Sequence, residues 1–168
     1  MSLSMFAATV PVFQRQLGAI GACLGKAEAH CAARKIEPGA LMQARLFPDM
    51  FALPRQVQIA ADFAKNTAAR LVGAEPPKWD DDEATLADLQ ARIAKTLDYV
   101  KTFQASQFEG AATRTITIPI RGEPRTFTGE VFLLHFALPN FYFHCATAYD
   151  ILRHNGVELG KGDFLGGR

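Results

Sequence analysis

Three of the four histidines in this chain lie in one apolar stretch, "HFALPNFYFHCATAYDILRHNG" (residues 135–156). Imidazole rings can bind a metal ion or accept a proton, but a buried helix can also hold a histidine that is merely hydrogen-bonded. His135 and His144 are nine residues apart, so at about 100° per residue they point to opposite sides of a helix. His154 follows Asp150 by four residues near the helix end, where charge pairing and the helix dipole explain it. His144 therefore remains the candidate for chemistry.

Asn140 is the informative neighbour of His144, because residues four apart point to the same face of a helix. That face is otherwise apolar and should pack in the core. A polar group there costs about 1–3 kcal/mol if it finds no partner. If the protein is catalytic, His144 is the expected metal ligand or general base, since its pKa lies nearest to neutrality.

The three cysteines, Cys23, Cys31 and Cys145, are an odd number and lack Cys-x-x-Cys spacing. This pattern predicts reduced, buried thiols in a cytoplasmic protein. His30 precedes Cys31 directly, so the two side chains diverge on a helix. We interpret His30 as a lone histidine at a helix edge.

Apolar residues at helical spacing predict four helices that would position these side chains. The first starts at Phe6 and ends at "KIEPGA" (residues 35–40), with Pro38 and Gly39 as its stop. The others span about residues 54–73, 85–101 and 128–155, with Gly73 and Gly156 as stops. Thr85 with Asp88 predicts a capping box, and Thr128 is the expected cap of the last helix. In the third helix, charged residues including Arg92 are expected to face solvent.

The segment "TRTITIPIRGEPRTFTGE" (residues 113–130) changes period from helical to alternating. It predicts a β-hairpin with its turn at "RGEP". The predicted fold is therefore mainly α, a single domain over residues 1–168. It is an antiparallel four-helix bundle with a small β-hairpin inserted before the last helix.

Composition excludes several classes of function. A formal net charge of +1 and 21% charged residues give no basic field for nucleic acid. Polar residues interrupt every apolar segment before the roughly 20 residues that span a bilayer, and the start lacks the basic region of a signal peptide. We expect a cytoplasmic protein with no nucleic-acid or membrane partner.

Several segments together resemble a bacterial family of unknown function within the DinB/YfiT-like superfamily. They are "MFAATVPVFQRQL", "RLFPDMFALPRQVQIAADFAKNTAARLVG", "FLLHFALPNFYFHCATAYDILRHNG" and "ELGKGDFLG", which cover nearly the whole chain. The resemblance implies a DinB-like four-helix bundle, commonly a homodimer. It also implies a divalent metal, often zinc or nickel, held by a histidine of the second helix and a His-x-x-x-His pair of the fourth. Some relatives are thiol-dependent transferases or isomerases.

This chain departs from that metal-binding pattern. The His-x-x-x-His pair falls on Asn140 and His144, and the ligand of the second helix falls on Gln56 in "PRQVQ". Two amide oxygens and one imidazole are a weak donor set for zinc. The resemblance therefore implies a degenerate metal site, and we expect it to keep a pocket for a small ligand that Gln56 and Asn140 orient beside His144.

Three alternatives stay open at this stage. The three polar residues can be a purely structural hydrogen-bonded cluster that joins two helices. The protein can be a functional divalent-metal enzyme with His144 as a ligand. It can also be a non-catalytic dimeric module, in which aromatic residues of the linkers and tail such as Trp79, Phe108 and Phe164 form an interface or a lid.

Overall fold

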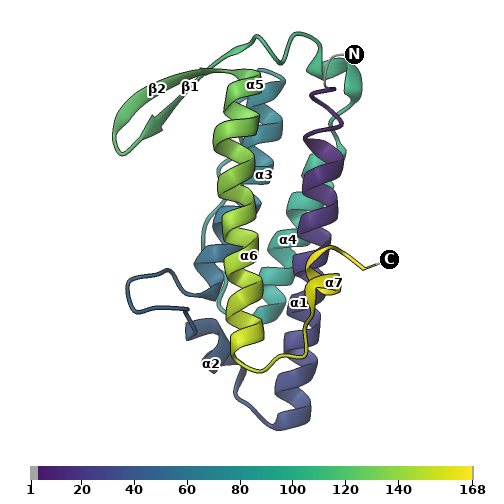
Figure 1. The fold of residues 1–168 in the computed structure, drawn as a ribbon, viewed down its shortest axis with the longest axis vertical. Helices are drawn as coiled ribbons and strands as arrows, with labels where there is room; N and C mark the ends of the chain where they lie inside the picture. Colours follow the sequence, from purple (N-terminus) through teal and green to yellow (C-terminus); the bar gives the residue numbers. More distant parts are fainter. Residues whose placement is uncertain (1–3, 168) are drawn as a thin grey trace.

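Four long helices form a closed bundle in the structure, a computed structural model that describes residues 4–167 (Figure 1). The long helices are α1 (Val10–Arg34), α3 (Leu53–Leu71), α4 (Leu86–Lys101) and α6 (Leu138–His154). The shorter elements are α2 (Pro38–Gln43), η1 (Ala105–Phe108), β1 (Thr115–Ile120), β2 (Glu123–Thr128), α5 (Gly129–Val131), the π-helix η2 (Phe132–Ala137) and α7 (Lys161–Phe164). The predicted fold class, a mainly α bundle with a hairpin before the last helix, is confirmed. The predicted domain, 1–168, exceeds the described range by residues 1–3 and 168.

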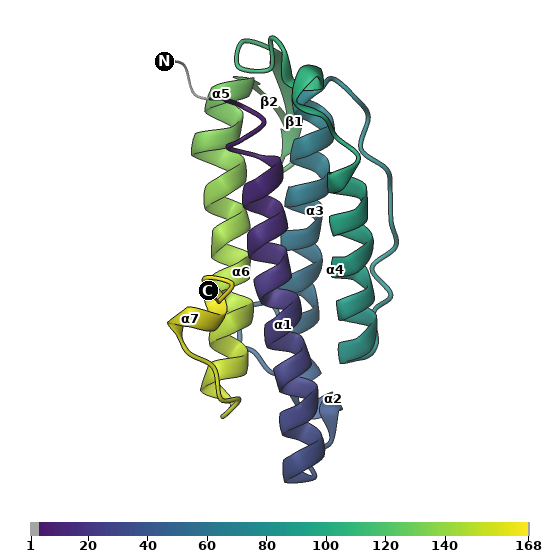
Figure 2. The same ribbon diagram turned by 90° about the vertical axis from the view of Figure 1, so that its right-hand side faces the viewer.

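The linker between α3 and α4 crosses the length of the bundle, so these two helices run in the same direction (Figure 2). It runs back along α3: Lys65 Nζ donates to the carbonyl of Pro77 and Gln58 Nε2 donates to Glu83 Oε2, each at 2.8 Å. Antiparallel packing joins α1 with α4 and α3 with α6. A long crossover of this kind is one of the standard ways to connect a four-helix bundle.

Arg92 of α4 holds this linker to the bundle, so its predicted position facing solvent is wrong. Its side chain is only 2% exposed and pairs with Asp62, Asp81 and Glu83 at 3.0–3.2 Å. It also donates to the carbonyl of Asp80 at 2.7 Å. The pattern around Leu89 and Ile93 predicts that the Arg92 side of α4 faces solvent, but the linker covers that side.

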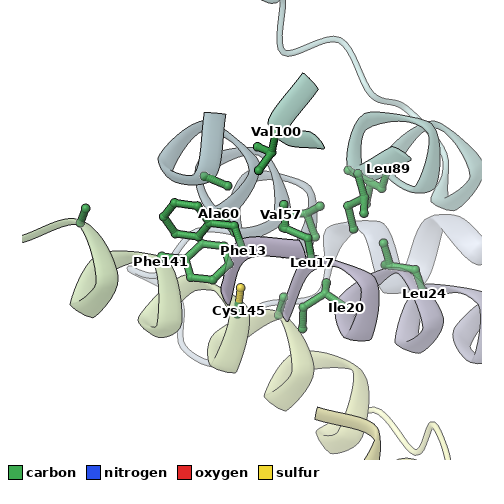
Figure 3. Packing of buried hydrophobic residues seen from close by; sticks show 14 of the residues in the cluster. Phe13, Leu17, Ile20, Leu24, Val57, Ala60, Leu89, Val100, Phe141 and Cys145 are labelled. Carbon is green, nitrogen blue, oxygen red and sulfur yellow. The ribbon is translucent and has the colours of Figure 1, made fainter. Parts of the chain in front are cut away.

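The core lies where the four helices meet (Figure 3). Phe13 of α1 and Phe141 of α6 pack edge to face with their ring centroids 4.8 Å apart, and both are fully buried. Val57 of α3 and Leu89 of α4 are buried there as well. The prediction of buried, free cysteines is confirmed for Cys23, Cys31 and Cys145.

Some helix boundaries match the sequence signals and others do not. Thr85 and Asp88 form the predicted capping box, and Gly73 and Gly156 follow their helices with φ of 81° and 90°. However, α1 begins at Val10 instead of Phe6, because residues from Met5 to Thr9 form turns before Pro11 enters the first helical turn. It ends at Arg34, where Lys35 takes a left-handed conformation, and Pro38 starts α2 instead of marking only a stop.

The last helix is not the single regular helix that the sequence predicts. Thr128 makes no side-chain capping hydrogen bond, since it ends β2 and pairs in register with Thr115. Six residues of π-helix, Phe132–Ala137, precede Pro139. Proline lacks an N–H and disturbs the regular ladder of hydrogen bonds, and π segments are a known way to absorb such a disturbance.

The hairpin is confirmed as a two-stranded antiparallel pair that projects from the bundle near the start of α5 (Figure 1). Ile116 and Ile118 of β1 are buried. Phe127 of β2 contacts Phe132 and Phe136 of η2, with ring centroids 6.1 and 5.6 Å apart. The aromatic contacts fix the hairpin against the π-helix. Within residues 4–167, none of the helices has the length and apolar character to span a bilayer.

Candidate functional site

A hydrogen bond between His144 of α6 and Gln56 of α3 forms the centre of the candidate site. His144 Nδ1 lies 2.7 Å from Gln56 Oε1, and Gln56 is only 1% exposed. Gln56 Nε2 donates to the carbonyl of Phe51 at 3.1 Å. This second bond fixes the amide orientation, so Oε1 accepts and the imidazole donates through Nδ1. Nε2 is then the nitrogen that carries the lone pair, and none of the described residues hydrogen-bonds to it.

Burial keeps this imidazole uncharged. It lowers the pKa of His144 from its ordinary value of 6.5 to about 4, and the nearby Arg55 cation acts in the same direction. At neutral pH the ring therefore presents an acceptor nitrogen without a charge. A hydrogen bond that fixes the tautomer in this way is what a ligating or proton-accepting histidine requires.

Aromatic side chains surround the imidazole. Phe63 of α3 stacks on it with centroids 6.2 Å apart and an interplanar angle of 19°, and Phe143 meets it edge to face at 5.2 Å. Phe143 and Phe51 are each 56% exposed. The imidazole thus lies against two aromatic rings, of which Phe143 reaches the surface.

Asn140 does not take part in the His144–Gln56 hydrogen bond. Its side-chain Nδ2 donates to the carbonyl of Phe136, one turn earlier, at 2.7 Å. That carbonyl belongs to the π-helix, where backbone bonding is shifted so that the N–H of Leu138 bonds to the carbonyl of Leu133. Of the three residues singled out from the sequence, the structure brings two together and bonds the third to its own helix.

These residues do not fit a tightly bound zinc or nickel ion. A three-ligand site needs three free donors that converge, but Gln56 Oε1 already accepts from His144, and Asn140 is held through Nδ2 to the carbonyl of Phe136 and not to this pair. In the described part of the chain, no cluster of three or more His, Cys, Asp or Glu side chains is arranged to hold a metal. Of the implied donor set, the Nε2 of His144 and the Oδ1 of Asn140 remain, fewer than a tight zinc or nickel site requires.

The thiols are equally unsuited to chemistry at this site. Burial raises the pKa of Cys23 to about 11 and raises those of Cys31 and Cys145 as well. A thiolate is the reactive form of cysteine, so these side chains act as apolar packing groups.

The other histidines lie apart from the site. His135 and His154 are exposed, and His30 is partly exposed on α1. No ion pair joins His154 to Asp150 between residues 4 and 167, so the helix dipole alone explains its place in the last turn. Phe108 is buried against Phe6, and its predicted role in an interface or lid is wrong.

Sequence reasoning missed Arg55 and Phe63, which shape the electrostatics and the walls around His144. Both lie on α3 near Gln56: Arg55 immediately precedes it, and Phe63 follows seven residues later, about two turns on. Helical spacing was therefore a signal that could have placed Phe63 on the same face.

Comparison with known proteins gives the family. The model of the domain of unknown function DUF1993 matches residues 5–165. The crystal structure of a DinB family member protein from Shewanella denitrificans is similar, with 46% sequence identity and a TM-score of 0.92. The similarity covers 98% of this chain and 93% of that one. No curated protein matches. With this match over nearly its whole length and a DinB-type bundle, the chain belongs to the DUF1993 family.

Proposed function

We propose that this protein is a cytoplasmic binding protein for a small, largely apolar molecule that donates a hydrogen bond to Nε2 of His144. The observation that carries the proposal is the chain of hydrogen bonds from Phe51 through Gln56 to His144, which presents Nε2 as an acceptor. Phe63 and Phe143 supply apolar contacts on the imidazole. The three buried, unpaired cysteines support the compartment.

The same features favour binding over catalysis. A general base works best when its pKa lies near the working pH, and an imidazole with a pKa of about 4 takes up a proton poorly at pH 7. A neutral acceptor among aromatic rings instead suits a ligand with a phenol, amide or similar N–H or O–H group. The donor atom would bond to Nε2 while the body of the ligand packs against the rings.

The proposal includes the loss of tight metal binding at the degenerate site. Metal content of protein purified without an affinity tag, measured beside His144→Ala, tests this part. We expect less than one zinc or nickel per chain in both proteins. Stoichiometric metal that disappears in the variant would instead support a divalent-metal enzyme.

Ligand binding is tested by a fragment screen observed by NMR on the wild type and on His144→Phe. The variant keeps an aromatic ring but lacks the acceptor nitrogen. Fragments with an N–H or O–H donor should bind the wild type, with shifts at His144, and lose affinity in the variant. His135→Phe, an exposed histidine in η2 just before α6, is the matched control. If both variants bind the same fragments as the wild type, the proposal fails.

Exposed aromatic rings favour a second candidate, a homodimeric interaction module. Phe143 contacts His144, the Phe51 carbonyl accepts from Gln56, and both rings are more than half exposed. Large exposed apolar side chains often mark an interface where they form a patch. In this case the polar pair would serve only to position the two helices.

A further inference from the structure

A hollow lies between α3 and the hairpin, beside the His144 site. Its cavity of about 260 Å³ has apolar walls from α3, β1 and η2. The apolar lining residues are Ile59, Phe63, Ile118, Pro119 and Phe136. Ligand pockets for drug-sized molecules span about 300–1,000 Å³, so this cavity suits a smaller molecule.

Most charges around this cavity are already neutralised. Asp62 pairs with Lys65 at 2.9 Å and with Arg92 at 3.0 Å. Arg55 pairs with Asp81 and also contacts Gln58. Neither Asp62 nor Arg55 therefore needs a ligand to balance it.

Arg70 and Asn66 differ from these neighbours. Both line the cavity and lie one helical turn apart on α3. Among residues 4–167, neither side chain has a hydrogen-bond or ion-pair partner, although both are partly buried. Burial lowers the pKa of Arg70, while the charge of Glu75 opposes that shift without forming an ion pair. A partly buried guanidinium with five unused donors is a natural place for an anion.

We propose that this cavity binds a small carboxylate with an apolar body. The carboxylate would accept hydrogen bonds from Arg70 and Asn66, and the body would pack against Ile59, Phe63, Ile118, Pro119 and Phe136. The planar fork of arginine matches the two oxygens of a carboxylate. A single free guanidinium with Asp62 in the same wall disfavours a dianion such as a phosphate monoester.

This proposal does not depend on the function proposed for His144. Phe63 stacks on His144 and also lines the cavity, so the two sites are neighbours. Arg55 also lines the cavity and acts on the pKa of His144, but Arg70 and Asn66 make no hydrogen bond with the Gln56–His144 pair. Either site can therefore fail its test without affecting the other.

Titration with benzoate, followed by amide chemical shifts, tests the proposal. Benzamide serves as the neutral analogue and phenyl phosphate as the dianionic one. We expect benzoate to shift amides of α3 and β1 and to bind at least about tenfold more tightly than either analogue, the size of effect that a charged hydrogen bond gives. Equal binding of benzamide, or tighter binding of phenyl phosphate, would overturn the proposed ligand class.

Variants identify the residue responsible. Arg70→Gln should weaken benzoate binding at least about tenfold. Arg70→Lys keeps the charge without the fork, so it should fold normally and bind with intermediate affinity. Arg153→Gln, an exposed arginine in the last turn of α6, controls for total charge and should bind like the wild type. His144→Phe should also leave benzoate binding unchanged. If Arg70→Gln and Arg70→Lys both bind as the wild type does, or if the shifts centre on His144, the cavity is not the site.

Discussion

At the scale of single residues, His144 is defined by its partners more than by its own chemistry. Gln56 fixes which nitrogen carries the proton, and burial keeps the ring neutral. Asn140, which the sequence predicts at the same site, instead donates a hydrogen bond to a carbonyl of the π-helix. Two polar residues on one helical face thus have unrelated roles.

The lowered pKa of His144 predicts a pH dependence of stability. Between pH 6.5 and about 4 the unfolded chain takes up a proton at His144 that the folded chain does not. The contribution of the neutral His144 to stability is therefore fully present above pH 6.5 and is lost as the pH falls through this window. Urea unfolding of the wild type and of His144→Phe from pH 7 to pH 4 measures the effect. The wild type should lose more stability than the variant, and parallel curves would contradict the assignment. Carboxylates with lowered pKa, such as Asp88, are common to both proteins.

Replacing Gln56 separates its role from that of Asn140. Gln56→Leu leaves the His144 N–H and the Phe51 carbonyl without partners, at an expected cost of about 1–3 kcal/mol. Asn140→Leu removes one bond and should cost about 1 kcal/mol. Ring ¹⁵N shifts of His144 provide the second measurement: they should change in Gln56→Leu and stay constant in Asn140→Leu. The reverse pattern would place Asn140 at the site.

At the scale of elements, the linker between α3 and α4 is a structural part of the bundle. It has no helical periodicity, but an ion pair with Arg92 and a hydrogen bond from Lys65 hold it against the bundle. Trp79 in the middle of it lies under the cations of Lys65 and Lys95, 4.6 and 4.4 Å from its ring centre. The helices it joins are held parallel as a result.

Loss of the Arg92 charge should therefore destabilise the bundle. Arg92→Gln leaves Asp62, Asp81 and Glu83 without their shared partner, and we expect a loss of about 3 kcal/mol, the lower end for a broken buried ion pair because two of the carboxylates are partly exposed. Lys101→Gln, which removes an exposed pair with Asp98, should change stability by less than about 0.5 kcal/mol. Chemical unfolding compares the two. Similar effects would show that the linker contributes little.

Two glycines show how closely the elements approach one another. A Cβ at Gly129, the first residue of α5, would lie 1.9 Å from the carbonyl oxygen of Ala111, whereas a Cβ at Gly18 on the outside of α1 meets nothing within 4 Å. Gly129→Ala should cost about 3 kcal/mol through forced backbone movement. Gly18→Ala should stabilise α1 by about 0.5–1 kcal/mol. Thermal unfolding of both variants gives the signs, and a neutral Gly129→Ala would contradict the close contact.

At the scale of the whole molecule, the exposed rings at the His144 site predict self-association. If the homodimer forms there, replacing Phe51 and Phe143 together by Glu should give a monomer, because each adds a charge to the buried face. Val131→Glu, an exposed apolar residue in α5, is the control and should remain dimeric. Sedimentation equilibrium distinguishes these outcomes. A dimer that survives the double substitution uses another surface.

The sequence by itself determined the bundle, the hairpin and the capping box. These follow from helical period and turn residues, which are local properties of the chain. The departure from the metal ligands came from its resemblance to the DinB-like family. The sequence did not predict that the face of α4 around Arg92 is covered, or that a π-helix precedes Pro139. Which residues a helix face contacts depends on the segment that packs against it.

Only the tertiary structure decided which polar groups meet. Gln56 and His144 are 88 residues apart in the chain and bond across two helices, while Asn140 bonds four residues back within its own helix. Only the packing of the hairpin against α3 shows that Arg70 and Asn66 line one cavity. Periodicity predicts which face a side chain occupies, but its partner depends on how helices distant in sequence pack, and that packing set the tautomer and charge of His144.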